Sequence, residues 1–289
     1  MPERSSWPVG KRAAAREGHW SITRPGTSVM TELSKEPLAS AVAVVTGGGS
    51  GIGRAIATAL SQTNGQVIVV ERDRSRRRST IADLEGSGAR GCWVSADLAT
   101  TRGVLSAIRA IERQCQAIDI LVHCAGVFES EPMEASAFDA LFATNVRAPW
   151  LLTRRLLPLL ERRGGQVVFV NSSAAFSTSQ GLGPYSASKA ALRMVADAFR
   201  AEVNASGIRV LTICPGRTAT PMQKRIHNME GKVYLPKSLL QPEDISSAVL
   251  AALGLPRTAE VTDLSIRPFQ KPGIPAEGRQ TRRPKAIVR

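Results

Sequence analysis

The segment GPYSASKA, residues 183–190, places Tyr185 four residues before Lys189, in a chain that has only two tyrosines. Residues four apart on a helix lie on one face, so the Lys189 ammonium would lie near the Tyr185 phenol. A phenol has a pKa of about 10, and a fixed cation nearby favours the phenolate and lowers that pKa. The pair could therefore donate and accept a proton near neutral pH. A surface tyrosine beside a solvated lysine has the same spacing, and the pair alone does not separate the two interpretations.

The elements that must position this pair alternate between apolar runs of strand length and segments of helix length. Helical segments include 101–114 and 186–206. Seven runs are continuously apolar, as in strands buried on both faces: 41–47, 66–71, 91–96, 118–126, 166–172, 208–216 and 261–268. Strands that alternate with helices predict an α/β fold in which a doubly wound, parallel, seven-stranded sheet forms a single domain.

A glycine-rich segment, TGGGSGIG at 46–53, follows the first predicted strand and opens the first predicted helix. Gly47, Gly51 and Gly53 permit a tight turn and a close approach of the backbone to a pyrophosphate. The free N–H groups at the helix N-terminus would then meet the phosphate charge. The position between strand and helix is more specific than the letters themselves, so we predict a dinucleotide phosphate site here rather than a flexible glycine turn.

Composition limits the classes of function. The chain has 289 residues, 43% of them hydrophobic, which is enough for one domain with a core of ordinary size. The net charge is +14, but residues 1–29 contribute +3 and residues 267–289 contribute +6. Basic ends of this kind are typical of solvated segments rather than of a nucleic-acid surface. We therefore predict disordered basic extensions at 1–38 and 269–289 around a domain at 39–268, and no nucleic-acid partner.

Location and metal content follow from what the sequence lacks. It has no run of 18 apolar residues, and residues 1–29 lack the apolar centre of a secretory signal. The four cysteines form no C-x-x-C pair and the three histidines are scattered, which favours reduced thiols and no metal site. We expect a cytoplasmic protein without membrane contact, whose translation starts at Met1 or at Met30.

The glycine spacing and the Y-x-x-x-K pair together resemble the short-chain dehydrogenase/reductase (SDR) family in its compact, non-extended form. The resemblance covers about residues 39–268, and its motifs occur in the family's order. It implies a Rossmann fold and an NAD(P)-dependent oxidoreductase that interconverts a secondary alcohol and a ketone, or an alcohol and an aldehyde, by hydride transfer. It also implies a homodimer or homotetramer built from the helices near 135–161 and 184–205.

The resemblance assigns catalytic roles to Asn145, Ser173, Tyr185 and Lys189. Tyr185 would be the general acid and base, while Lys189 would lower its pKa and bind the nicotinamide ribose. Asn145, in FATNVRAPW, implies a locally kinked helix and a water that links Lys189 to solvent. VNSSAAF offers two serines: the family's spacing to the tyrosine favours Ser172, and the end of the fifth strand favours Ser173. We favour Ser173 and keep Ser172 as the alternative.

Cofactor contacts follow from the same resemblance. Asp97 would hold the adenine, the P-G segment from Pro215 would cover the nicotinamide, and HCAG at 123–126 stands where the family usually has N-N-A-G. His123 is expected to be a hydrogen-bonded structural residue. The full predicted set is Gly47, Ser50, Gly51, Ile52, Gly53, Glu71, Asp97, Leu98, Cys124, Ala125, Gly126, Tyr185, Lys189, Pro215, Gly216, Thr218 and Thr220.

The choice of nucleotide depends on the end of the second run, VIVVERDRSRRR. Glu71 would bond the adenosine ribose and repel a 2′-phosphate, which favours NAD. Arg72 and Arg74 would attract that phosphate, so NADP is the alternative. Residues 223–244 resemble the family's substrate lid, and their apolar side chains indicate either an apolar small-molecule substrate or packing. A catalytically silent nucleotide-binding scaffold on the same fold is the alternative function.

Overall fold

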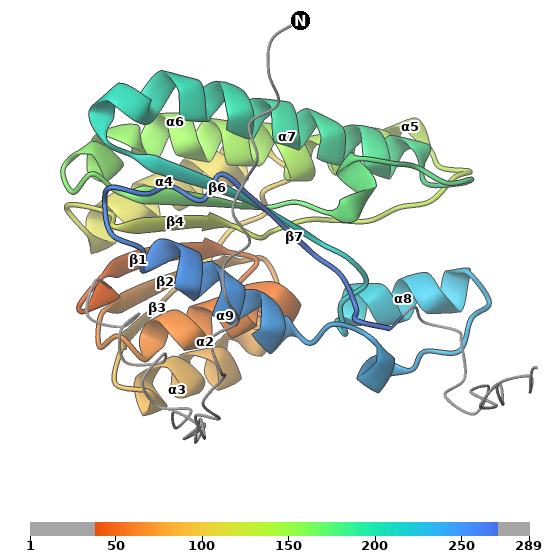
Figure 1. Cartoon of the computed structure of the whole chain (residues 1–289), viewed down its shortest axis with the longest axis horizontal. Coiled ribbons are helices and arrows are strands. Elements are labelled where there is room, and N and C mark those ends of the chain that lie inside the picture. Colours follow the sequence, from red (N-terminus) through yellow and green to blue (C-terminus); the bar gives the residue numbers. More distant parts are fainter. Residues whose placement is uncertain (1–37, 271–289) are drawn as a thin grey trace, which may run out of the picture.

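A single parallel sheet organises the molecule (Figure 1). The computed structural model describes residues 38–270, and the extensions predicted at 1–38 and 269–289 lie outside this range except for residues 38, 269 and 270. The seven strands are hydrogen-bonded in the order β3-β2-β1-β4-β5-β6-β7, which confirms the predicted doubly wound sheet. They are β1 Val42–Thr46, β2 Gln66–Glu71, β3 Arg90–Ser95, β4 Ile120–His123, β5 Gln166–Val170, β6 Arg209–Pro215 and β7 Asp263–Ile266.

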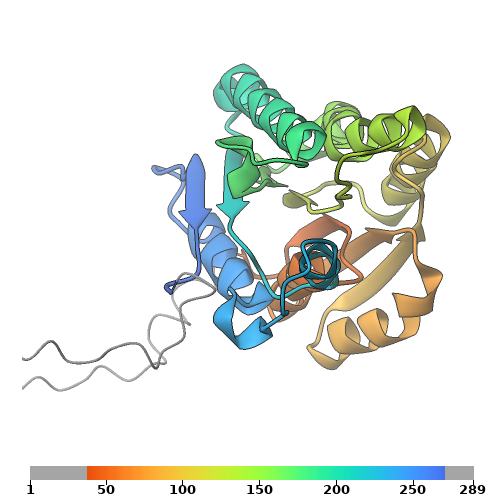
Figure 2. The same ribbon diagram turned by 90° about the vertical axis from the view of Figure 1, so that its right-hand side faces the viewer.

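Helices cover both faces of this sheet. One layer contains α4, α6 and α7, and the other contains α2, α3 and α9, as Figures 1 and 2 show. Each layer encloses an apolar cluster against its own face of the strands. The helices are α2 Gly51–Ser61, α3 Arg77–Gly86, α4 Thr101–Gln114, α5 Ala135–Phe142, α6 Ala148–Glu161, α7 Gly183–Val203, α8 Pro221–Met229 and α9 Pro242–Leu253. A π-helical turn, η3 Ala143–Arg147, joins α5 to α6, and a 3₁₀ turn, η4 Ser173–Ala175, follows β5.

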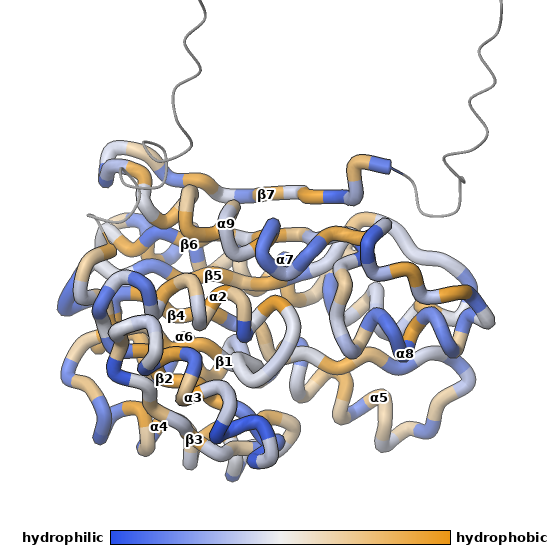
Figure 3. The backbone as a smooth tube through the Cα atoms, turned by 90° about the horizontal axis from the view of Figure 1, so that it is seen from below, coloured by the Kyte–Doolittle hydropathy of each residue, from blue (hydrophilic) through white to orange (hydrophobic). Residues whose placement is uncertain are grey.

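The strand order reverses at β1, which pairs with β2 on one side and with β4 on the other. In sheets of this type the connections diverge at the reversal and leave a crevice at the carboxyl ends of the strands. The two chain segments that leave β1 and β4 therefore border the same crevice. β7 lies at the far edge of the sheet, as Figure 3 shows. None of the helices between residues 38 and 270 has the length and the apolar character that a membrane crossing requires.

The ends of β1 and β4 are held together by a hydroxyl group. Thr46 Oγ1 accepts hydrogen bonds from the backbone N–H groups of Cys124 and Ala125, both at 3.1 Å, and donates to the carbonyl of Val122 at 3.3 Å. A Cβ atom on Gly47 would lie 2.7 Å from Ala125 Cα, so the two backbones touch where only glycine fits. The phosphate loop thus starts at a fixed distance from the segment after β4.

His123, the last residue of β4, is 2% exposed and packs against Phe169, with ring centroids 5.0 Å apart. Its Nε2 lies 2.7 Å from Thr153 Oγ1, and that hydroxyl donates its own hydrogen to the Pro149 carbonyl at 2.8 Å. The imidazole must therefore be the donor to Thr153, with its proton on Nε2. Burial lowers the pKa of His123 to about 3, so this side chain is neutral and structural in the folded protein, as the sequence predicts.

This buried imidazole should make the fold sensitive to acid. The unfolded chain binds a proton at His123 below about pH 6.5 and the folded chain does not, so stability is lost as the pH falls from there toward 3. Between about pH 7.5 and about pH 5.5 the free energy of unfolding should fall by about 1.4 kcal/mol more in the wild type than in His123→Gln. Urea unfolding of both proteins at the two pH values measures the difference. Equal losses would show that His123 is protonated in the folded state as well.

Candidate active site

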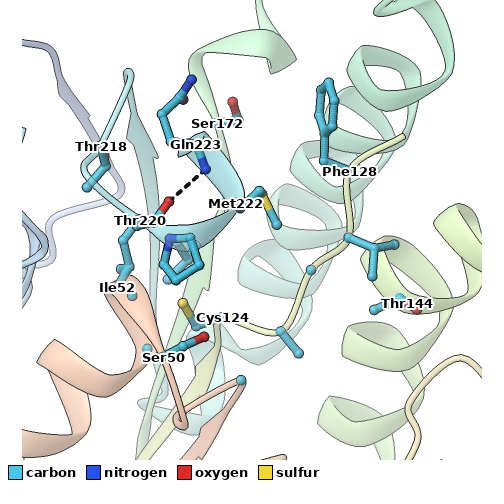
Figure 4. Close-up of a pocket in the computed structure, with 18 of the residues that line it drawn as sticks. Ser50, Ile52, Cys124, Phe128, Thr144, Ser172, Thr218, Thr220, Met222 and Gln223 are labelled. Atoms are coloured by element: carbon cyan, nitrogen blue, oxygen red, sulfur yellow. Dashed lines mark hydrogen bonds between the residues drawn. The ribbon is translucent and has the colours of Figure 1, made fainter. Parts of the chain in front are cut away.

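A cavity of about 700 Å³ lies at the carboxyl ends of the strands. Every residue of the predicted cofactor set lines it, as do Ser172 and Ser173. The structure therefore brings together the phosphate loop, the ends of β2 to β6 and the N-terminal part of α7, from positions spread over 170 residues of sequence. Figure 4 shows this pocket with Ser50 and Ile52 of the phosphate loop on one side, Phe128 opposite, and Met222 pointing into it from α8.

The phosphate loop presents the uncapped start of α2 to the cavity. Ser50 is the N-cap residue, but its side chain makes no capping bond, and the first turn contains no acidic residue. The first N–H groups of α2 and the positive end of its dipole are thus available to an anion. Gly51, with φ of +51°, needs glycine here, and a Cβ on it would lie 3.0 Å from the methyl group of Thr220. The arrangement fits a pyrophosphate held between this helix start and Thr220.

The end of the cavity beside β2 and β3, where the family resemblance would put the adenosine and which we call its adenosine end, carries both signs of charge. Glu71 Oε1 accepts the backbone N–H groups of Arg72 at 2.8 Å and Asp73 at 3.3 Å, so the carboxylate is turned onto the loop that follows β2. The Arg72 side chain is 71% exposed and lies 3.9 Å from Asp97 Oδ1. Arg74 donates to Ser95 Oγ at 3.2 Å and does not line the cavity. The charged groups that line this end of the cavity after β2 are therefore the carboxylates of Glu71 and Asp73 and the guanidinium groups of Arg72 and Arg76.

Tyr185 and Lys189 lie near the start of α7 and face the cavity together. Lys189 Nζ donates to the Val170 carbonyl at 3.2 Å and lies 6.0 Å from the centre of the Tyr185 ring. The backbone carbonyl of Lys189 accepts Asn171 Nδ2 at 3.1 Å, which joins α7 to the end of β5. Burial lowers the pKa of Lys189 to about 8. Lys189 is thus buried and fixed, Tyr185 is half-buried at the cavity wall, and the alternative of a surface tyrosine beside a solvated lysine is wrong.

The pKa of Tyr185 is raised rather than lowered, which corrects our expectation. Burial is the largest cause, because it disfavours the phenolate, and a hydrogen bond with the Ser172 side chain acts in the opposite direction. The Lys189 ammonium is itself desolvated and held by the Val170 carbonyl, so it does not outweigh the burial of the phenol. Tyr185 is therefore protonated at neutral pH in this state.

The two candidate serines occupy different environments. Ser172 is half-buried beside Tyr185, and its Oγ also accepts the Ala174 N–H at 3.1 Å. Ser173 is exposed and begins the 3₁₀ turn η4. The turn directs the first serine toward the tyrosine and the second toward the rim of the cavity. The geometry favours Ser172, against our preference for Ser173, because one step along an extended backbone reverses the side-chain direction.

Asn145 lies in the π-helical turn, which agrees with the locally irregular helix that we expect. It is fully buried and does not line the cavity. Its Oδ1 accepts the Val127 N–H at 2.9 Å, and its Nδ2 donates to the Val127 carbonyl at 3.0 Å and to Ser188 Oγ at 3.1 Å. Asn145 therefore fixes the segment after β4 against α7 at Val127, which itself lines the cavity.

Several cavity residues carry no sequence signal that could have identified them. Phe128 is 3% exposed and packs edge-on against the Tyr185 ring, with centroids 5.0 Å apart. Gln223 and Arg225 line the cavity from α8, one turn after the Thr220 cap that Figure 4 marks with a dashed line. Among the apolar residues of the segment after β6, Met222 and Ile226 line the cavity. Met229, Val233 and Leu235 are exposed and do not line it.

Comparisons with known proteins agree with this geometry. The model of the short chain dehydrogenase family matches residues 41–231. The chain is 34% identical over 245 residues to human dehydrogenase/reductase SDR family member 4, covering 80% of this chain and 86% of the relative. It is 32% identical over 251 residues to the glycine betaine reductase ATRR of Emericella nidulans, covering 84% of this chain but only 20% of that longer protein.

Solved structures give the same result. An alcohol dehydrogenase from Thermococcus sibiricus, complexed with 5-hydroxy-NADP, has a TM-score of 0.71 at 25% identity and covers 81% of this chain and 99% of its own. The L-sorbose reductase of Gluconobacter frateurii, complexed with NADPH and L-sorbose, also has a TM-score of 0.71 at 25% identity, and covers 80% and 96%. The fold of this chain, its glycine loop, its tyrosine and lysine at the cavity wall and the family match lead to one conclusion: the chain belongs to the short-chain dehydrogenase/reductase family of oxidoreductases.

Proposed function

We propose that the protein reduces a ketone or aldehyde to the corresponding alcohol, and catalyses the reverse oxidation, with Tyr185 as the general acid and base. The observation that carries the proposal is the protonated Tyr185 beside Ser172 at the wall of the cavity, with Lys189 one helical turn away. Because its pKa is not below the ordinary value of a phenol, Tyr185 is protonated at neutral pH, which is the donor form that carbonyl reduction needs. Two similar proteins are named as reductases, which supports this direction.

The residues present fit a nicotinamide dinucleotide. The uncapped N–H groups of α2 would hold the pyrophosphate, Asp97 the adenine, and Lys189 the nicotinamide ribose. When bound, the dinucleotide supplies or accepts the hydride. The P-G segment at 215–216 lines the cavity beside β5 and β6, where it would cover the nicotinamide.

In this proposal the protein's own groups handle the oxygen and its proton. The Tyr185 hydroxyl gives its proton to the substrate oxygen as negative charge develops there, and Ser172 donates a hydrogen bond to the same oxygen. The Lys189 ammonium stabilises the phenolate that remains. Asn145 holds the Val127 backbone and Ser188, and so keeps α7 in register with the cavity wall. Phe128, Met222 and Ile226 add apolar surface to the pocket beside the polar groups of the same segments, which favours a substrate with an apolar part.

A matched pair of serine variants tests this assignment. Ser172→Ala should lower kcat for carbonyl reduction by roughly 10²-fold or more, because it removes a donor to the developing oxyanion. Ser173→Ala, one residue away on the same turn, should change kcat by less than about threefold, and Tyr185→Phe should abolish turnover. Steady-state rates with a panel of ketones and aldehydes give the comparison. Equal losses in the two serine variants would contradict the role of Ser172, and activity in Tyr185→Phe would contradict the mechanism.

We propose NAD(H) as the preferred nucleotide, because the Glu71 carboxylate would come against a 2′-phosphate. Titration of NADH and NADPH, followed by tryptophan fluorescence and calorimetry, should give a Kd at least about tenfold lower for NADH in the wild type. Glu71→Ala should remove this preference, and Arg72→Ala should leave it in place. Tighter NADPH binding that is lost in Arg72→Ala would reverse the assignment. Binding of neither nucleotide would remove the oxidoreductase proposal.

We also propose that the outer surface of α6 and α7 pairs with a second copy of the chain. Trp150 on α6 is 47% exposed and Met194 on α7 is 61% exposed, and both border the same apolar hollow. Burial of such side chains favours association. Light scattering should give a mass of at least two chains, and Trp150→Glu with Met194→Glu should give a single folded chain. A monomeric wild type at micromolar concentration would contradict this pairing.

A further inference from the structure

The segment between β6 and α9, residues 217–240, is held mainly by its own contacts; we call it the lid. Its two ends are joined at the base, where Ala219 N–H donates to the Leu240 carbonyl at 2.7 Å and Leu240 N–H donates to the Arg217 carbonyl at 3.1 Å. Arg217 pairs with both oxygens of Glu230, at 2.9 and 2.7 Å. Helix α8 of the lid stands in front of the carboxyl edge of the sheet, away from the helical layers (Figure 2).

Arg225 makes the contact that crosses the cavity mouth. Its Nη2 donates to the backbone carbonyl of Phe128 at 2.6 Å, and a guanidinium nitrogen lies 3.6 Å from Glu129 Oε1. Within residues 38–270, this is the one hydrogen bond that joins the lid to the segment after β4. The Arg225 side chain is 56% exposed, so the bond forms at the boundary between the cavity and solvent.

The acceptor of the Arg225 hydrogen bond, Phe128, also carries the ring that packs against Tyr185. Phe128 is 3% exposed, and its ring lies edge-on to Tyr185. The preceding residue, Val127, is held at both its N–H and its carbonyl by Asn145. Phe128 is therefore fixed from the core side through Val127 and from the lid side through Arg225.

We propose that Arg225 is a positioning residue, whose bond to the Phe128 carbonyl couples closure of the lid to the placement of the Phe128 ring over Tyr185. The inference rests on the proposed role of Tyr185 as the proton donor. When the bond forms, the lid closes the cavity and the ring excludes water from the phenol in the same event. When it breaks, the lid swings on its base and Tyr185 becomes hydrated.

The consequence for the phenol has a definite sign. Burial is the main cause that raises the pKa of Tyr185, so hydration should lower that pKa. Loss of the Arg225 charge alone would act in the opposite direction, because a cation stabilises the phenolate. Outside the adenosine end, the cavity is also lined by the ionisable groups of Cys124 after β4, Lys189 on α7, and Arg217 and Glu230 of the lid. A substitution at Arg225 leaves all four of these side chains in place.

The test uses the fact that the chain has only two tyrosines. In a Tyr234→Phe background, ultraviolet titration of the full chain without nucleotide or substrate reports the ionisation of Tyr185 alone. Arg225→Met should move its midpoint down by about one pH unit. Arg225→Lys, which keeps the charge and a donor, should restore part of the change. Lys224→Met, which removes an exposed cation from the same helix outside the cavity, should leave the midpoint unchanged.

Hydrogen exchange and kinetics complete the test. Arg225→Met should speed amide exchange in residues 126–129, and should lower kcat for carbonyl reduction roughly tenfold while the nucleotide Kd changes less than about twofold. An unchanged or raised midpoint in Arg225→Met would overturn the proposal, as would an equal change in Lys224→Met. A lowered midpoint in a protein that reduces no carbonyl would instead contradict the proposed function and leave the coupling between Arg225 and Tyr185 intact.

Discussion

The close contact between the backbones of the β1 and β4 ends is the constraint on which the site depends. A Cβ atom on Gly47 would clash with Ala125 Cα at 2.7 Å, and one on Gly53 would lie 2.3 Å from the Gly47 carbonyl oxygen. Because of these contacts, the start of α2 packs directly against the ends of the strands, and its free N–H groups lie at the carboxyl edge of the sheet. The Thr46 hydroxyl holds the same junction with three hydrogen bonds. The position of the glycine loop and that of the segment after β4 are therefore both fixed by the packing at the junction of β1 and β4.

The catalytic side of the cavity depends on polar groups that are buried and satisfied by backbone. Asn145 and Lys189 are nearly inaccessible, and their amide and ammonium groups bond to Val127 and Val170. Buried polar groups are costly without such partners, so each one fixes its position strongly. The π-helical turn places Asn145 where it can reach the next segment. These hydrogen bonds fix the side of the cavity behind Tyr185 to the core. The lid, in contrast, is joined to the segment after β4 mainly through Arg225.

The environment of Tyr185 shows why one charged neighbour, Lys189, does not by itself determine the pKa of the phenol. The attraction between an ammonium and a phenolate favours ionisation, whereas removal of the phenol from water opposes it. In this structure the second effect is larger, because Phe128 packs against the ring and Lys189 is desolvated as well. The acidity of the phenol at this site is thus set by its burial rather than by the Y-x-x-x-K spacing alone.

The sequence alone predicted the seven strands and the parallel doubly wound sheet, and the residues that its family resemblance assigned to the cofactor line one cavity. These are recoverable because buried strands are continuously apolar and because glycine at 47, 51 and 53 reports a local backbone requirement. Only the tertiary structure showed that Ser172 lies beside Tyr185 while Ser173 is exposed, since this depends on how a 3₁₀ turn directs two adjacent side chains. It also reversed the expected shift of the Tyr185 pKa and brought Arg225 to Phe128, which lies 97 residues earlier. Burial and long-range contact arise from the packing of distant segments, and no local pattern of residues encodes them.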